Sequence, residues 1–435
     1  MKRDIYQRLL RWKDSAERKP LILQGARQTG KTYILQELGR EAYESTCYFN
    51  FEEDVGLDHF FQKNLAPHRI IRELGIYSKR EIRPGRDLII FDEIQSSSNA
   101  LAALKYFQEQ ANDYHLAAAG SLLGVKLAAA KPFPVGKVNF LNLYPLSFAE
   151  FLDAVGEERY RRYLGQLAAP DPLPQPFHEE LISLLRSYYF TGGMPEAVSC
   201  FVRSGDPVKV RTIHKEIINS YLLDFAKHAP TADIPKLSHI WESIPGQLAR
   251  ENKKFMFSAI RKSARARDYE NAIIWLEDAG LIHRCFAAST AKQPLSSYLN
   301  RDIFKVYALD VGLLGALANI PPEIMVAGDR LFHEFQGAFV ENYVAQHLRA
   351  MFEQPLVYWK SSGRVAELDF LCEINGIVLP LEVKAGINPK SKSLLSFDNQ
   401  FHPPLLSRAT LLNLKRDGKI LNIPLYALNN LRQLI

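Results

Sequence analysis

Short apolar runs alternate with longer amphipathic or loop segments along the first third of the chain. The apolar runs lie at residues 21–23, 47–51, 88–91, 115–119 and 138–143. Such alternation predicts a parallel β-sheet with helices on both faces, and we place this α/β domain at residues 1–155. Apolar side chains at helical spacing predict a helix over residues 1–18, and the small apolar segment 122–130 is expected to be a core helix.

The pattern becomes mainly helical after residue 155. Residues 156–235 are predicted to form a helical linker or lid region, interrupted by a proline-rich loop at residues 170–176. Residues 236–330 have the order of a winged helix, with three helices, a strand and a polar loop that would be the wing. In this interpretation Asp268 caps the third helix and Gly280 ends it.

The charges around this third helix leave its partner open. A winged helix that reads DNA normally carries basic or amide side chains there, whereas this helix carries Glu270, Glu277 and Asp278. Four basic residues precede the helix and are placed to contact a phosphate backbone: Arg261, Lys262, Arg265 and Arg267. The winged unit is therefore expected either to contact DNA or to dock a protein partner.

A phosphate-binding motif follows the first apolar run. The pattern G-x-x-x-x-G-K-[ST] is matched between a predicted strand and a predicted helix by Gly25, Ala26, Arg27, Gln28, Thr29, Gly30, Lys31 and Thr32. The backbone N–H groups of such a loop bind the phosphates of a nucleoside triphosphate, here ATP. Lys31 is expected to reach the β and γ oxygens, and Thr32 to offer its hydroxyl to Mg²⁺.

A second half of this site is predicted where the strand at residues 88–91 ends in Asp92 and Glu93. Asp92 is expected to hold Mg²⁺ together with Thr32, and Glu93 to polarise the attacking water. Because simple binding needs no such base, the pair favours hydrolysis over transfer to a small molecule. Ser121, after the next strand, is expected to lie near the γ-phosphate.

The last part of the chain, residues 331–435, is predicted to form another α/β domain. Glu341 lies in a helical pattern, and Asp369 lies on the first strand of a predicted hairpin. Glu382 and Lys384 lie on its second strand and face the same side, because side chains two residues apart share a face of a strand. Paired carboxylates hold Mg²⁺, and a lysine can steady the charge that develops on a phosphodiester.

This arrangement resembles the core of PD-(D/E)XK nucleases. The resemblance implies a restriction-endonuclease-like fold with metal ligands at Glu341, Asp369 and Glu382, and catalytic roles for Glu382 and Lys384. One aspartate and an E-x-K sequence occur by chance in many sheets. Solvated charges at a sheet edge, or an inactive descendant of a nuclease, are therefore alternatives.

The chain as a whole resembles bacterial and archaeal AAA-type ATPases that carry a large C-terminal domain of unknown function. The shared segments are residues 19–32, 92–95, 120–121, 144–148, 150–151, 192–195 and 310–314. The resemblance implies an AAA-like core in which Glu93 is the base and Ser121 the sensor. Many relatives have Gly-Arg before the last core strand, where this chain has Gly136 and Lys137. A lysine lacks the guanidinium fork, so activation of a neighbouring subunit through this position is in doubt.

Composition limits the remaining alternatives. A chain of 435 residues suggests about three domains. The net charge of +6, much of it in the first twenty residues, permits nucleic acid as a partner without requiring it. Four isolated cysteines suit a reducing cytoplasm. We expect no signal peptide and no membrane-spanning segment.

The leading functional hypothesis is a Mg²⁺-dependent ATPase coupled to a nuclease-like domain that acts on DNA in defence or repair. The alternative is an ATP-driven switch that remodels or recruits a protein partner, with the nuclease-like fold inactive. A homo-oligomer is compatible with both.

Overall fold

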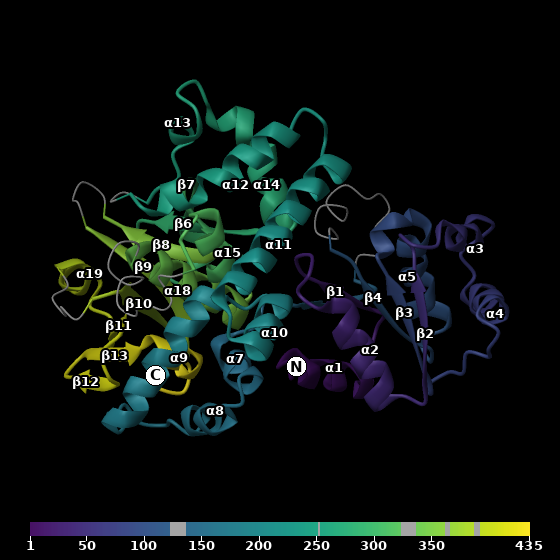
Figure 1. Ribbon diagram of the computed structural model, residues 1–435, viewed down its shortest axis with the longest axis horizontal. Helices are drawn as coiled ribbons and strands as arrows, with labels where there is room; N and C mark the ends of the chain where they lie inside the picture. The colour runs from purple at the N-terminus through teal and green to yellow at the C-terminus, as the bar shows by residue number, and fades with distance from the viewer. Residues whose placement is uncertain (122–135, 251–252, 323–335, 362–365, 387–391) are drawn as a thin grey trace. The chain divides into compact units, whose positions relative to one another are not determined.

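The computed structural model describes residues 1–121, 136–250, 253–322, 336–361, 366–386 and 392–435. The chain divides into two compact units (Figure 1). Unit 1 comprises Met1–Tyr144 and Asp278–Gly280, and unit 2 comprises Pro145–Glu277 and Leu281–Ile435. The helix predicted at residues 122–130 lies outside the described residues.

Unit 1 contains a five-stranded sheet whose order is β2-β3-β4-β1-β5. Its strands are β1 (Leu21–Gln24), β2 (Ser45–Asn50), β3 (Asp87–Asp92), β4 (His115–Ala119) and β5 (Asn139–Asn142). Every neighbouring pair is parallel. The predicted parallel sheet is therefore confirmed, and its strands lie where the apolar runs placed them.

Helices cover both faces of this sheet. They are α1 (Ile5–Asp14), α2 (Lys31–Ala42), α3 (His59–Gln62), α4 (Pro67–Tyr77) and α5 (Ser98–Gln110), with short 3₁₀ turns η1 (Val55–Asp58) and η2 (Ile94–Ser96). Alternate residues of β3 face opposite sides. Leu88 and Ile90 pack with α1 and α2, whereas Ile89 and Phe91 pack with α3, α4 and α5. Burial on both faces explains why the strand is continuously apolar.

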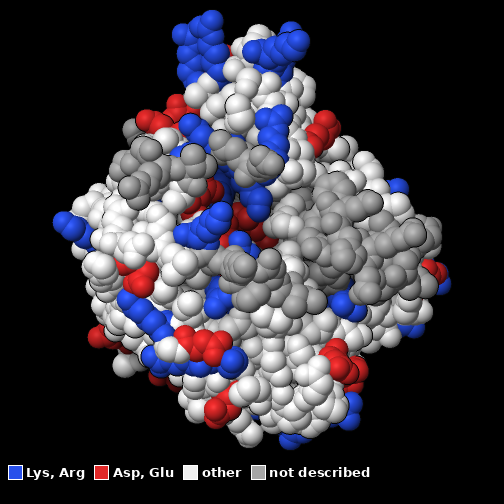
Figure 2. All heavy atoms as spheres, turned by 90° about the vertical axis from the view of Figure 1, so that its left-hand side faces the viewer, with Lys and Arg blue, Asp and Glu red and all other residues white. Residues whose placement is uncertain are grey.

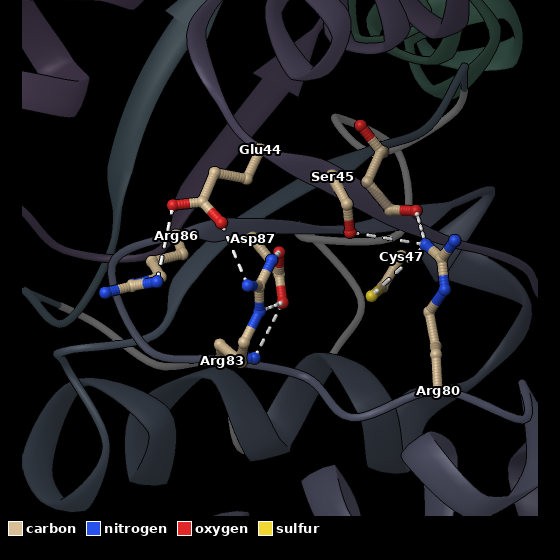
Figure 3. A network of polar contacts seen from close by, with 8 residues as sticks. Glu44, Ser45, Cys47, Arg80, Arg83, Arg86 and Asp87 are labelled. Carbon is tan, nitrogen blue, oxygen red and sulfur yellow. Dashed lines mark hydrogen bonds and ion pairs between the residues drawn. The ribbon is translucent and has the colours of Figure 1, made fainter.

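A polar network fixes the start of β3, at the end of the strand opposite to Asp92 (Figure 3). Asp87 is buried and accepts hydrogen bonds from Arg83, at 2.7 Å from the backbone N–H and 2.8 Å from Nη2. Burial raises the pKa of Asp87, but the hydrogen bonds from Arg83 outweigh it and hold this pKa below its usual value. Arg83 and Arg86 also pair with Glu44, which precedes β2. The network ties two neighbouring strands together away from the phosphate loop.

Unit 2 begins with a series of helices. They are α7 (Phe148–Ala154), α8 (Glu158–Gly165), α9 (Gln175–Thr191), α10 (Pro195–Ser204), α11 (Pro207–His228), α12 (Ile234–Leu248), α13 (Phe257–Ile260) and α14 (Ala266–Asp278). A capping box starts α7. Ser147 Oγ accepts from Glu150 N at 3.2 Å, and a Glu150 carboxylate oxygen accepts from Ser147 N at 2.9 Å.

An eight-stranded mixed sheet follows, with the order β12-β13-β11-β10-β9-β8-β6-β7. Its strands are β6 (Ile282–Ala288), β7 (Leu299–Ala308), β8 (Leu356–Lys360), β9 (Glu367–Ile374), β10 (Ile377–Val383), β11 (Leu406–Thr410), β12 (Lys415–Asp417) and β13 (Ile420–Pro424). The connecting helical segments are η3 (Leu295–Tyr298), α15 (Val311–Leu317), α18 (Gln336–Phe352), α19 (Lys392–Phe401) and η4 (Leu425–Asn430). Both α18 and α19 contact β10.

Local predictions for unit 2 need three corrections. The proline-rich loop ends earlier than predicted, because α9 starts at Gln175 and accepts Pro176 in its first turn, where a missing N–H is harmless. The third helix of the predicted winged helix starts at Ala266, so Asp268 lies inside its first turn rather than capping it. The predicted wing strand, β6, forms a hairpin with β7 and also pairs in parallel with β8. That hairpin is therefore part of the eight-stranded sheet.

Three sequence motifs that are far apart in the chain meet inside unit 2. Gly193 N donates to Asp310 Oδ2 at 2.7 Å, and Leu146 N donates to Gly193 O at 2.7 Å. A Cβ on Gly193 would lie 2.1 Å from Leu146 O, and one on Gly312 would lie 2.7 Å from Thr191 O. These glycines are needed because backbone atoms approach too closely for any side chain.

Candidate functional site

The phosphate-binding motif forms a tight loop between β1 and α2. Gly30 precedes the first turn of α2 with a left-handed φ of 94°, a conformation that favours glycine. A Cβ on Gly25 would lie 2.2 Å from the backbone oxygen of Leu143, so that position also requires glycine. The motif therefore adopts the strand–loop–helix context predicted for it.

Side chains of the loop bind its own carbonyl groups. Lys31 is only 6% exposed, and its Nζ donates to Gly25 O at 2.9 Å and to Ala26 O at 2.8 Å. Thr29 Oγ1 donates to Ala26 O at 2.9 Å. The ammonium group is thus held inside the curl of the loop, beside the backbone that would face a phosphate.

Arg3 holds this loop from outside, a role that the sequence did not predict. Its Nη1 donates to Thr29 O at 3.0 Å, and its Nη2 donates to Tyr144 O at 2.6 Å. Arg3 is buried, although it belongs to the basic first twenty residues of the chain. No local signal distinguishes it from the basic residues of the helix that follows, α1.

The carboxylate of Asp92 lies beside the start of α2. Thr32 Oγ1 donates to Asp92 Oδ2 at 2.6 Å, so the two predicted magnesium ligands are brought together. Tyr48 on β2 donates to the same oxygen at 2.8 Å, and Asp92 is only 2% exposed. Burial, together with the neighbouring carboxylate, raises the pKa of Tyr48 well above its ordinary value, so this hydroxyl stays a donor. Tyr48 was not predicted as a site residue.

Glu93 follows Asp92 in a conformation that is uncommon for a residue other than glycine. Its φ is 49° and its ψ is 42°, which is the left-handed region. Glu93 Oε2 accepts from Ser121 Oγ at 3.3 Å and also from the Gln95 side-chain amide. The predicted base and the predicted sensor are therefore in contact. Backbone strain of this kind is concentrated at functional sites.

Lys137 occupies the position where many resembling proteins have an arginine. Its Nζ forms an ion pair with Glu109 at 3.0 Å, and its side chain is 38% exposed. A role in activating a neighbouring subunit stays a prediction.

In unit 2, the four residues predicted for nuclease chemistry lie on neighbouring elements. Glu341 is buried on α18, Asp369 lies on β9, and Glu382 lies near the end of β10. Asp369 Oδ2 accepts from Val383 N at 2.8 Å. Glu382 Oε1 pairs with Lys384 Nζ at 2.6 Å. The predicted turn between β9 and β10 is present, with left-handed φ values at Asn375 and Gly376.

A buried lysine stands among these acids. Lys305 Nζ on β7 lies 2.8 Å from Glu367 Oε1, 3.2 Å from Glu341 Oε1 and 3.9 Å from Asp369 Oδ1. Although burial lowers the pKa of Lys305, these carboxylates raise it well above its ordinary value, so the ammonium stays charged. The signal that could have found it is a lysine within the otherwise apolar end of a strand.

The pKa values of the two predicted metal ligands beside Lys305, Glu341 and Asp369, are shifted in opposite directions. Burial raises the pKa of Glu341, but Lys305 and Lys253 outweigh it and lower this pKa to about 2. The pKa of Asp369 is raised, first by burial and then by the charge of Glu341. Two carboxylates that share one lysine thus differ in their tendency to ionise.

Residues 17–152 match a model of an AAA domain. Together with the phosphate loop and the acidic end of β3, this match identifies residues 17–152 as an AAA-type ATPase domain. Residues 182–324 match a domain of unknown function (DUF8612), and residues 336–428 match another (DUF4143). No curated protein sequence matches the chain. Among the described residues, no helix is both long and apolar enough to span a bilayer.

Several solved structures are similar to the chain at low sequence identity. The Walker-type ATPase PABY2304 of Pyrococcus abyssi is 16% identical, with a TM-score of 0.47, over 73% of this chain and 95% of that one. The Aeropyrum pernix ORC1 protein in complex with DNA is 13% identical, with a TM-score of 0.31, over 74% and 92%. AMPPCP-bound DnaA from Aquifex aeolicus is 13% identical, with a TM-score of 0.26, over 60% and 81%.

Proposed function

We propose that the AAA-like domain, predicted at residues 1–155, hydrolyses ATP with Mg²⁺. The observation that carries this proposal is the joint placement of Thr32, Asp92 and Glu93 at the start of α2 and the end of β3. A hydroxyl 2.6 Å from a carboxylate at this position suits a hydrated Mg²⁺ ion, which takes oxygen ligands. The ion would supply charge neutralisation at the β- and γ-phosphates.

The remaining residues of the site divide the work by their chemistry. The backbone N–H groups of the loop bind the phosphates at the N-terminus of α2, where the helix dipole favours negative charge. The residues of the phosphate loop are Gly25, Ala26, Arg27, Gln28, Thr29, Gly30, Lys31 and Thr32. Lys31 exchanges its carbonyl partners for phosphate oxygens. Glu93 orients and deprotonates the attacking water. Ser121 contacts Glu93 and is placed to make the position of Glu93 depend on the presence of the γ-phosphate.

Replacing Lys31 tests the binding half of this proposal. The Lys31→Ala protein should bind ATP about 10- to 100-fold more weakly, because it loses a charge-assisted hydrogen bond to the phosphates. Affinity is measured with a fluorescent ATP analogue, and turnover by phosphate release. Lys63→Ala, at an exposed lysine of unit 1, is the matched control and should behave as the wild type. Unchanged affinity in Lys31→Ala would show that the loop does not bind the triphosphate.

A second function is proposed for unit 2, namely contact with DNA. Arg261, Lys262 and Arg265 are all exposed in the segment that leads into α14. The positive end of the α14 dipole adds to their charge. Of the acids of α14, Glu277 lies at the far end of the helix from these residues and is paired with Arg284 at 2.6 Å. On the face at the left of Figure 1, Figure 2 shows Lys and Arg side chains around a hollow.

Reversing these three charges tests the contact. A triple variant, Arg261→Glu, Lys262→Glu and Arg265→Glu, should weaken binding to duplex DNA and reduce the slope of log K against log salt by about 2 to 3. Binding is measured by fluorescence anisotropy at several salt concentrations. The control reverses two exposed basic residues of β12, Lys415 and Arg416. If the triple variant and the control bind equally, this segment does not contact DNA, and docking of a protein partner becomes the better explanation.

The proposed domains of unit 2 follow the same division. Residues 156–235 provide a helical lid or linker, residues 236–330 the winged-helix-like part, and residues 331–435 the nuclease-like part. Supporting the last is the order of elements α18-β8-β9-β10-α19-β11, with Glu341, Asp369 and Glu382 on three of them. Whether these acids can also cleave DNA depends on their capacity to bind a divalent ion.

A further inference from the structure

Lys305 is buried among acidic side chains. It lies in the C-terminal half of β7, and its side chain is only 1% exposed. Its Nζ contacts carboxylates from two other elements, Glu341 on α18 and both Glu367 and Asp369 on β9. A buried ammonium is stable only when it is paired and hydrogen-bonded, and here it is.

Two further lysines of the chain pair with carboxylates of this cluster. Glu341 Oε2 accepts from Lys253, and its Oε1 accepts from the Tyr307 hydroxyl. Glu382 pairs with Lys384 at 2.6 Å. Three lysines, Lys253, Lys305 and Lys384, therefore face the four carboxylates of Glu341, Glu367, Asp369 and Glu382. In unit 2, each of the three carboxylates predicted to bind a metal, Glu341, Asp369 and Glu382, contacts a lysine.

A divalent ion does not fit this arrangement. Mg²⁺ and Ca²⁺ bind carboxylate oxygens at about 2.0–2.6 Å and need several of them free. A divalent ion near Glu341 and Asp369 would stand beside the fixed ammonium of Lys305, and like charges in a buried site repel strongly. Among the described residues, no three His, Cys, Asp or Glu side chains are grouped so as to hold a metal ion.

We infer that Lys305 takes the place of a metal ion in the nuclease-like part of unit 2, so that this core carries its own cation and does not cleave DNA. The acids then serve to hold β7, β9 and α18 together rather than to activate water. Figure 2 shows Asp and Glu atoms inside a hollow and Lys and Arg side chains around it. The inference concerns unit 2 alone and is independent of ATP turnover in unit 1.

Exchange of the lysine for a metal ion provides the test. The full-length Lys305→Met protein, without nucleotide, should unfold about 5–10 °C below the wild type, because removal of one partner leaves buried carboxylates unpaired. Millimolar Mn²⁺ should restore much of that loss, since the site can then accept an ion. The same Mn²⁺ should leave the wild type unchanged. Adding Asp369→Asn to Lys305→Met should abolish the recovery. If Lys305→Met folds and Mn²⁺ does not stabilise it, the ammonium does not occupy a cation site and the inference fails.

A second measurement decides the question even if Lys305→Met does not fold. Mn²⁺ binding to the nucleotide-free wild type is followed by electron paramagnetic resonance, with Asp369→Asn for comparison. The wild type and Asp369→Asn are expected to give the same Mn²⁺ titration curve. Binding by the wild type that disappears in Asp369→Asn would overturn the inference, as would nicking of supercoiled plasmid that depends on Glu382. ATP turnover measured in the same preparations reports on unit 1 separately.

Discussion

The Glu93→Gln protein is expected to bind ATP as tightly as the wild type and to hydrolyse it about 10²- to 10⁴-fold more slowly. Glutamine has nearly the same shape and can still accept a hydrogen bond from Ser121, so the left-handed turn at this position is preserved. It cannot take a proton from water. Because binding depends on the loop and catalysis on this carboxylate, affinity and turnover should separate in a single variant.

Two measurements and one control make this result interpretable. Affinity is measured with a fluorescent ATP analogue, and the chemical step by single-turnover phosphate release. Glu81→Gln, at an exposed acid of unit 1, should match the wild type in both. If Glu93→Gln turns over within a few-fold of the wild-type rate, the base lies elsewhere and Glu93 has been misassigned.

The geometry of the candidate ATP site could be predicted from the sequence because its parts are local. The phosphate loop depends on backbone geometry set by Gly25 and Gly30, and a continuous motif specifies it. The acids at the end of β3 follow a short apolar run, rich in isoleucine, that indicates a buried strand. The sheet order brings these two segments together, and parallel strands end at the same edge.

The contacts that support the site could not be predicted, because each joins residues that are far apart in the sequence and meet only in the folded structure. Arg3 meets Thr29 and Tyr144, and Tyr48 meets Asp92, only after the strands have paired. The hairpin of β6 and β7 shows the same limit. The sequence predicted a strand followed by a polar loop there, but the pairing of β6 with β8 joins residues that are distant in the sequence. Lys305 is the most consequential case, since its charge alters what the predicted acids can do.

The stability of unit 2 is expected to fall steeply as the pH drops below about 6.5, because three of its histidines are buried in the neutral form. Burial lowers the pKa of His214 to about 3, and the charge of Arg211 adds to the effect. Burial and Arg349 lower the pKa of His283 to about 3. Burial lowers the pKa of His347 to about 4, against a backbone hydrogen bond that raises it.

The sign follows from which state binds the proton. Below about pH 6.5 the unfolded chain protonates these histidines, whereas the native chain does not until about pH 3 to 4, so acid favours unfolding. At about pH 5 each histidine costs roughly 2 kcal/mol, or about 6 kcal/mol together. Asp310 opposes this, because burial raises its pKa to about 6 and acid removes the penalty of its buried charge. That gain is about 1.4 kcal/mol at the same pH. Asp369, whose pKa is raised by burial and by the charge of Glu341, opposes the histidines in the same direction, so the net loss of stability is smaller than their sum.

Urea unfolding between about pH 5 and 8 measures this balance, with tryptophan fluorescence as the signal. Of the four tryptophans in the chain, Trp241, Trp275 and Trp359 are buried in unit 2, so the signal follows that unit. His214→Gln keeps a donor for Thr191 O, which His214 Nε2 reaches at 2.9 Å, and should remove about a third of the pH dependence. His68→Gln, at an exposed histidine of unit 1, should leave the slope unchanged. A free energy of unfolding that stays constant from pH 8 to 5 would mean that the native unit opens enough to protonate these histidines before it unfolds.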